Sequence, residues 1–170
     1  MDCRLKAGDF IGAGALYRIN EDGIHQHLVT GELLSEKRVV IFGGPAPFSR
    51  LDTQQAKEYA ELAEEMLKYV DAVYGIYCQD AFVMNQFDKH IRETLPNHKV
   101  EFWADGDALF TRGHGLEHNF VYQGLSLRSG RYALIVKDQT LEHVLLDNYQ
   151  EINLTSAENV LQWLKDPNET

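Results

Sequence analysis

Three buried-looking strands that alternate with helix-like segments constrain the fold of this chain more than any other feature. The strands are RVVIFGG (38–44), AVYGIYC (72–78) and VEFWAD (100–105). Continuous β-branched and aromatic runs of this kind are typical of strands that are covered on both faces. Between the first two strands, apolar residues recur at helical spacing. Because crossovers between parallel strands are right-handed, the pattern predicts a parallel core with helices on both faces.

The flanking segments add antiparallel strands to this core. Residues 14–29 alternate apolar and polar side chains around EDG and predict an N-terminal β-hairpin. Residues 131–147 predict a second hairpin that turns near KDQT. The expected fold is a single α/β domain over 1–170, with a mainly parallel or mixed central sheet and flanking helices, similar to the thioredoxin-like layout.

Capping residues predict where two of the helices begin. Asp80 precedes one periodic segment, and Pro96 closes it. Thr155 or Ser156 precedes the last periodic segment, where Glu158 is in reach for a capping box. These signals predict helices over about 81–95 and from 157 onward.

The acidity of the chain excludes some classes of partner. Its 170 residues carry a net charge of −10, and the acidic residues are spread along the chain. Nucleic acid and anionic membranes are repelled by this charge, so neither is expected as a partner. No run approaches the roughly 18–20 apolar residues that span a bilayer. The start, MDCRLKAGDF, lacks the features of a signal peptide, so we expect a cytoplasmic protein.

The histidines and cysteines show no metal-ligand pattern. His25 and His27 share one strand face, and His114 and His118 are four residues apart. Gly115 interrupts the second pair, and neither pair has a third ligand nearby in the sequence. We interpret these histidines as surface residues, and we expect neither a metal nor a cofactor.

Four segments, in order, carry a resemblance to a known family. They are VTGELLSEKRVVIFGGPAPF, QDAFVMNQFDKH, VEFWADGDALFTRGHGL and RYALIVKDQTLEHVLLD. From about Thr30 to Leu164, the chain resembles the peroxiredoxins, specifically the type-5 (redoxin) branch. The resemblance implies a thioredoxin-like peroxiredoxin fold, with an active site in the loop before the helix that starts near residue 50.

The active-site motif of that family reads Pro-Gly-Ala-Phe-Thr-Pro-Thr-Cys. Here Pro45, Phe48 and Ser49 match the proline, the phenylalanine and the hydroxyl, and Arg131 matches the active-site arginine. Asp52 stands where the resemblance implies the peroxidatic cysteine. In the family a thiolate attacks the peroxide and becomes a sulfenic acid. A carboxylate has no equivalent redox step, which predicts a protein that is not a thiol peroxidase and acts as a binding or regulatory module.

Three roles are open for Asp52 itself. It can stabilise the start of the helix as a cap or first-turn residue. It can form an ion pair with Arg131, in which the carboxylate replaces the thiolate electrostatically. It can also act as a general base, although the sequence shows no paired acid, nucleophile or metal cluster to support this.

An alternative retains family chemistry through a different thiol. The only cysteines are Cys3 and Cys78, and a peroxidase or oxidoreductase would have to use one of them. We expect Cys78 to be a buried, inert thiol, and Cys3 to lie on a mobile N-terminal segment without an activating helix end. A further alternative is a small-molecule binder that uses Ser49 and Arg131, but the charge of Asp52 would repel an anion there.

Aromatic side chains are expected to fill the core, with one group of exceptions. The resemblance places the active-site loop and the DAFVM helix start at a dimer interface, which makes Phe48, Phe82 and Val83 candidates for a subunit contact. The expected partners are a second copy of this chain, in a homodimer, and active redoxin relatives. By their place in the expected strands and helices, core packing is the default role of Phe82, Phe87, Phe102, Trp103 and Phe110.

Overall fold

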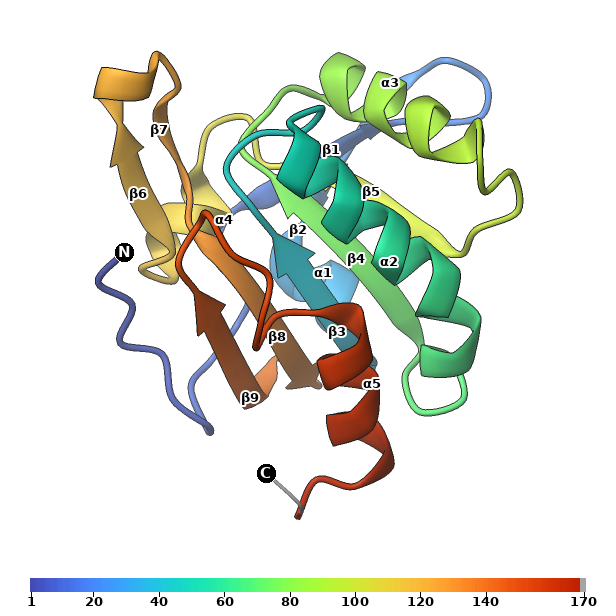
Figure 1. Cartoon of the computed structure of the whole chain (residues 1–170), viewed down its shortest axis with the longest axis vertical. Coiled ribbons are helices and arrows are strands. Elements are labelled where there is room, and N and C mark those ends of the chain that lie inside the picture. The colour runs from blue at the N-terminus through green and yellow to red at the C-terminus, as the bar shows by residue number, and fades with distance from the viewer. Residues whose placement is uncertain (169–170) are drawn as a thin grey trace.

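A seven-stranded mixed sheet forms the centre of the computed structural model, which describes residues 1–168. The strand order is β2-β1-β5-β4-β3-β8-β9 (Figure 1). The seven strands are β1 (Ala15–Ile19), β2 (His25–Val29), β3 (Arg38–Gly43), β4 (Ala72–Tyr77), β5 (Val100–Ala104), β8 (Arg131–Lys137) and β9 (Thr140–Asp147).

The parallel part of the sheet is confined to its centre. Strand β4 pairs in parallel with β3 and with β5, as the three buried runs predict. The other four pairings in the described sheet are antiparallel, so it is mixed rather than mainly parallel. Both predicted hairpins are confirmed, as β1–β2 and β8–β9. Pairing of β8 with β3 sets Tyr132 opposite Gly43, which brings the start of β8 beside the loop that follows β3.

Three helices cover one face of the sheet. They are α2 (Arg50–Met66), α3 (Ala81–Arg92) and α5 (Ala157–Lys165), and they lie in front of the sheet in Figure 1. Their side-chain caps are Ser49, Asp80 and Ser156, each accepting a hydrogen bond from a backbone N–H three residues later. The buried core on this face includes Val40, Phe42, Tyr59, Ala63, Tyr77, Met84, Phe87, Ile91, Phe102, Val160 and Trp163.

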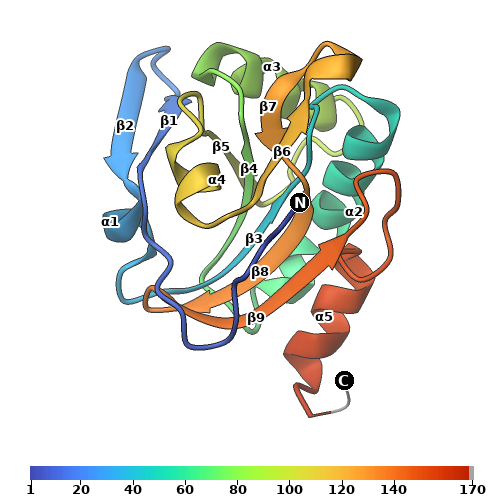
Figure 2. The same ribbon diagram turned by 90° about the vertical axis from the view of Figure 1, so that its left-hand side faces the viewer.

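The opposite face is covered by short elements and by the N-terminal segment. Helices α1 (Thr30–Leu34) and α4 (Leu109–Gly113) lie on this side, away from α2 and α5 (Figure 2). The buried core here includes Ile11, Leu16, Leu34, Val39, Ile41, Trp103, Phe110, Leu116 and Leu134, and Met1, Cys3 and Leu5 pack against it. The segment around Cys3, which we expected to be mobile, thus packs on this face of the sheet through apolar contacts.

His114 is buried, and the expectation that it is a surface residue is wrong. Its Nδ1 donates to the carbonyl of Phe110 at 2.8 Å, and its Nε2 accepts from the N–H groups of Gly12 (3.2 Å) and Ala13 (3.3 Å). This pattern needs a neutral ring, and burial lowers the pKa of His114 below its ordinary value. The imidazole therefore fastens the N-terminal segment to α4.

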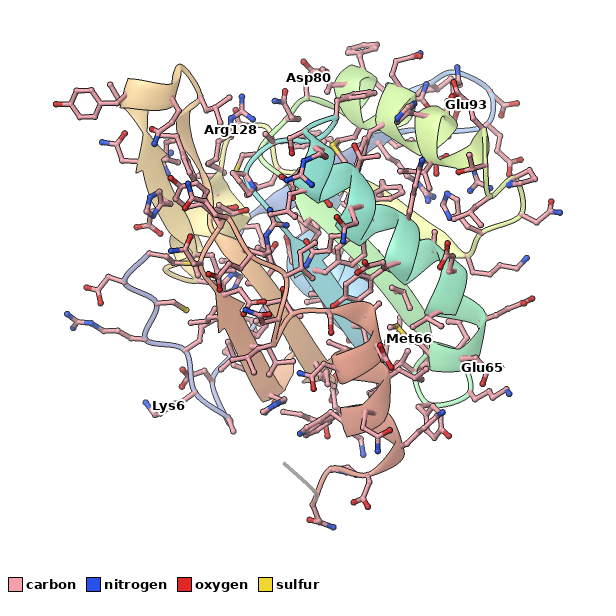
Figure 3. The ribbon with its side chains drawn as sticks, in the orientation of Figure 1. Lys6, Glu65, Met66, Asp80, Glu93 and Arg128 are labelled. Carbon is pink, nitrogen blue, oxygen red and sulfur yellow. The ribbon has the colours of Figure 1, made fainter. Side chains whose placement is uncertain are left out.

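A separate two-stranded arm projects from the body of the protein. Strands β6 (Glu117–Phe120) and β7 (Ser126–Ser129) pair with each other, and a 3-10 turn, η1 (Val121–Gln123), joins them. The sequence pattern predicts no strand in this segment, because its strands have four residues each and little alternation. Arg128 anchors the arm by donating to the Pro45 carbonyl at 2.9 Å, and Figure 3 shows it between the arm and the start of α3.

No helix in residues 1–168 is long and apolar enough to cross a membrane.

Candidate functional site

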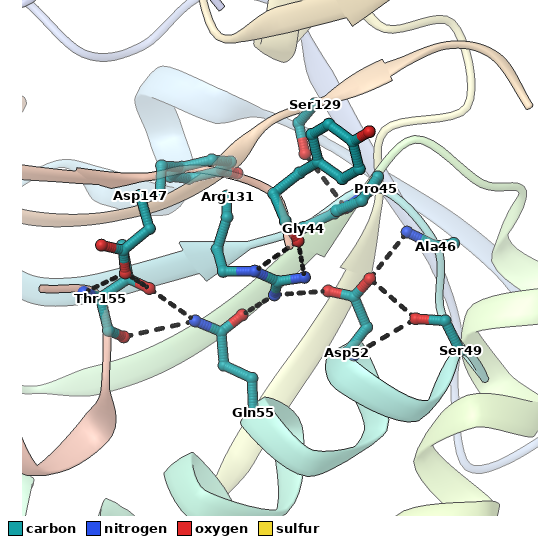
Figure 4. Close-up of polar contacts among 12 residues, drawn as sticks. Gly44, Pro45, Ala46, Ser49, Asp52, Gln55, Ser129, Arg131, Asp147 and Thr155 are labelled. Carbon is teal, nitrogen blue, oxygen red and sulfur yellow. Dashed lines mark hydrogen bonds and ion pairs between the residues drawn. The ribbon is translucent and has the colours of Figure 1, made fainter. Parts of the chain in front are cut away.

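The first turn of α2 holds Asp52 in a reciprocal set of hydrogen bonds. The N–H of Asp52 donates to Ser49 Oγ at 3.2 Å, and Ser49 Oγ donates to Asp52 Oδ2 at 3.1 Å. The N–H of Ala46 also donates to Oδ2, at 2.9 Å (Figure 4). Ser49 is thus the cap of the helix, and Asp52 is the residue that closes the loop 46–49 onto it.

A buried ion pair joins Asp52 to Arg131. Arg131 Nη1 lies 2.9 Å from Asp52 Oδ1, and each side chain is only 1% exposed. The strand pairing described above brings the two together, because Arg131 begins β8 next to the loop between β3 and α2. Of the three roles open for Asp52, the ion pair is present in the structure. Asp52 is also the acidic residue of the first turn of α2, whereas the cap itself is Ser49.

Gly44 makes room for this ion pair. A Cβ on Gly44 would collide with Asp52 Oδ1 and lie within 2.8 Å of Arg131 Nη1. The carbonyl of Gly44 accepts from Ser129 Oγ at 3.1 Å, which fixes the loop from the side of the arm. The second glycine of RVVIFGG is therefore a position where a larger side chain would displace the buried charges.

Arg131 also holds the loop between β9 and α5. Its Nη1 donates to Gln55 Oε1 at 2.6 Å, and its Nε and Nη2 donate to the Tyr149 carbonyl at 3.2 and 3.0 Å. Gln55 Nε2 in turn donates to Thr155 Oγ1 at 3.0 Å. Gln55 is not among the predicted site residues, although a polar residue on the apolar face of a predicted helix is a signal that could have found it.

Asp147 completes this network at the far end. It accepts from the N–H groups of Asn153, Leu154 and Thr155 and from Thr155 Oγ1. Partial burial acts to raise the pKa of Asp147, but the hydrogen bonds from Thr155, Asn153 and Leu154 outweigh it and hold the pKa below its usual range. The carboxylate therefore organises residues 147–155 in its ionised form.

The predicted site residues are only partly brought together. Pro45, Ser49, Asp52 and Arg131 lie around one buried cluster of charges. Phe48 does not join them. Its ring packs at the surface against Phe87 and His90 and is 48% exposed, and its backbone has a left-handed φ of 71°. A non-glycine residue in that region carries strain of about 1–3 kcal/mol.

The candidate dimer residues lie at the surface around α3. Phe82 is 65% exposed, Phe48 is exposed and Val83 is half-buried. Phe82 is thus not a core residue, whereas Phe87, Phe102, Trp103 and Phe110 are buried as expected.

Neither thiol is in an activating environment. Cys78 lies just after β4, half-buried, with its Sγ 3.1 Å from Thr111 Oγ1, and burial raises its pKa to about 11. Burial also raises the pKa of the Cys3 thiol. Both groups are therefore protonated near neutral pH, and a protonated thiol is a poor nucleophile. No group of three or more potential metal-ligating side chains occurs within residues 1–168.

Comparisons with known proteins agree with one another. The Redoxin family model matches residues 6–161. The chain is 30% identical to Peroxiredoxin-2B of Arabidopsis thaliana, over 94% of this chain and 98% of that one. It is 31% identical to Peroxiredoxin-2C of Oryza sativa subsp. japonica, with the same coverage.

Solved structures give the same result. Reduced Prx3 from Vibrio vulnificus in complex with hydrogen peroxide is similar to this chain with a TM-score of 0.86 and 27% identity, over 94% of this chain and 99% of that one. With its mixed sheet and flanking helices, the fold is thioredoxin-like, and the chain belongs to the redoxin family, that of the peroxiredoxins.

Proposed function

We propose that this chain is a redoxin-family protein of the type-5 branch that does not turn over peroxides and serves as a binding or regulatory module. In this proposal, Asp52 occupies the position of the peroxidatic cysteine. Its carboxylate pairs with Arg131, as the thiolate would in an active relative, and it holds the active-site loop in one conformation.

The observation that carries the proposal is the closed Asp52–Arg131 pair. A peroxide must reach both a nucleophile and the arginine that polarises it, yet both side chains are 1% exposed and already bonded to each other. The other described hydrogen bonds of Arg131 are donated to Gln55 Oε1 and to the Tyr149 carbonyl. Arg131 therefore stabilises the fold and is not available to polarise a peroxide.

The chemistry of the available side chains supports the same conclusion. A carboxylate cannot accept an oxygen atom from a peroxide and be reduced again by a thiol, as sulfur can. The alternative, a peroxidase that uses Cys78 or Cys3, is opposed by the raised pKa of both thiols. A general-base role for Asp52 is opposed by its burial and by its use as a triple hydrogen-bond acceptor.

Two further parts of the proposal concern partners and location. We propose a homodimer through the surface around Phe48, Phe82 and Val83, where the first two side chains are exposed and the third is half-buried. Association with active redoxin relatives would use the same surface. The cytoplasmic location stays a prediction.

The test is peroxide consumption, measured by rapid mixing with a small dithiol reductant, for the unaltered protein and for Asp52→Cys. The expected result is no turnover by the unaltered protein. Turnover by the variant would show that Ser49 and Arg131 still form a working peroxide cradle. Inactivity of both, with the variant shown to be folded by circular dichroism, would show that the pocket itself has diverged, which leaves the proposal standing. Turnover by the unaltered protein would overturn it.

A further inference from the structure

A groove runs between helices α2 and α5 on the surface of the protein. It has a volume of about 540 Å³, and the two helices lie side by side in Figure 1. Leu62 of α2 and Ile152 of the loop before α5, both half-buried, provide apolar surface in it, and Leu161 of α5 also lines it but is buried. A groove of this kind between two helices has the shape that accepts the apolar face of a helical segment.

The polar rim of the groove is acidic. Glu58 and Glu61 line it from α2, Glu158 lines it from α5, and Lys165 is the one basic side chain among its lining residues. None of the three glutamates forms a salt bridge within residues 1–168. On a chain with a net charge of −10, this rim repels a second copy of the chain and attracts a basic segment.

One wall of the groove is fixed by the buried network described above. Ile152 and Ser156 line the groove, and they belong to the segment that Asp147 organises through its hydrogen bonds to Asn153, Leu154 and Thr155. Arg131 holds the same segment through the Tyr149 carbonyl. The wall is therefore preorganised, which lowers the entropic cost of binding.

We infer that the α2–α5 groove docks a basic amphipathic helical segment of a partner protein. The apolar face of the segment packs chiefly on Leu62 and Ile152, and its lysines or arginines face Glu58, Glu61 and Glu158. This inference rests on the binding role proposed above and names the chemistry of the partner. The peroxide test can succeed while the docking test fails, so the two failures are distinguishable.

The test uses a defined probe and the intact protein. The probe is a fluorescent amphipathic peptide of leucine and lysine, about 14 residues or four helical turns long. Its anisotropy is titrated with the unaltered protein, with E61Q/E158Q, and with the matched control E32Q/E36Q, whose glutamates are exposed near α1. A peptide of the same composition in scrambled order controls for amphipathicity. Circular dichroism checks that each variant is folded.

The proposal predicts that the patterned peptide binds and that the scrambled peptide binds less. E61Q/E158Q should weaken binding about fivefold, while E32Q/E36Q, with the same net charge, stays within about twofold of the unaltered protein. Amide NMR shifts on binding should cluster in residues 54–62 and 152–165.

Several results would overturn the proposal. If E61Q/E158Q and E32Q/E36Q weaken peptide binding equally, the binding depends on the net charge of the chain and not on the groove. Equal binding of the scrambled peptide, shifts outside the groove, or no binding would exclude this occupant. Self-association that E61Q/E158Q abolishes would assign the groove to a second copy instead.

Discussion

Removing the Asp52 carboxylate should cost this protein a large part of its stability. In Asp52→Ala, the guanidinium of Arg131 stays buried beside Gln55 and the Tyr149 carbonyl but loses its counter-charge. The N–H of Ala46 and the hydroxyl of Ser49 lose their acceptor as well. Breaking a buried ion pair from one side costs about 3–5 kcal/mol, because an uncompensated charge remains in the interior. We expect a loss of this size in the free energy of unfolding, measured by urea denaturation.

Two controls separate the buried pair from a general effect of the substitution. Glu32→Ala removes an exposed carboxylate and should change stability by no more than about 0.5 kcal/mol. A double-mutant cycle with Arg131→Met should give a coupling energy of about 1–3 kcal/mol between Asp52 and Arg131. A loss below about 1 kcal/mol for Asp52→Ala, or a coupling near zero, would refute the view that this pair carries charge in the protein interior.

Three further predictions test other parts of the structure. Burial lowers the pKa of His114, so as pH falls below the ordinary value of about 6.5 the unfolded chain binds a proton that the folded chain rejects. The free energy of unfolding should then fall by up to about 1.4 kcal/mol per pH unit, and His114→Gln should flatten this slope; an unchanged slope would contradict the assignment. The pKa of Cys78, about 11, predicts that its alkylation by iodoacetamide rises with pH up to that value, and a plateau near pH 8 would contradict the burial of this thiol. Gly44→Ala should lower the thermal midpoint, because the new Cβ displaces Asp52 and Arg131, whereas Gly23→Ala, in open space but at a positive φ, serves as a backbone-strain control that should lower it less.

Local signals in the sequence were sufficient for most of the fold. Strand β4 was predicted because its run AVYGIY is apolar throughout, and the helix starts at Asp80 and Ser156 because their side chains cap the backbone within three residues. The N-terminal hairpin follows from alternation around a short turn, and the second follows from an apolar run that turns near KDQT. These features depend on residues that are close together in the chain, so they can be predicted from a single sequence.

Contacts between distant segments were not predictable in the same way. His114 looked like a surface residue because its acceptor role depends on Gly12 and Ala13, about a hundred positions away. Gln55 joins Arg131 to Thr155 only once α2, β8 and α5 have packed together. The arm β6–β7 was missed because its four-residue strands carry no clear period.

The candidate site was predicted in part. Position 52 and Arg131 were picked out by resemblance to the peroxiredoxins, and their ion pair was one of three open roles. The sequence does not predict how fully the Asp52–Arg131 ion pair is buried. The side chains of both residues are 1% exposed, and Gly44 leaves space only for the two charged groups.

The most direct test of the central claim is a count of free thiols in the unaltered protein before and after exposure to hydrogen peroxide, with the peroxide concentration followed in the same sample. The account predicts that Cys3 and Cys78 both stay titratable under denaturing conditions and that the peroxide concentration does not change. Rapid loss of one thiol per chain, with consumption of peroxide and recovery of the thiol by a dithiol, would show a working thiol peroxidase and contradict the account.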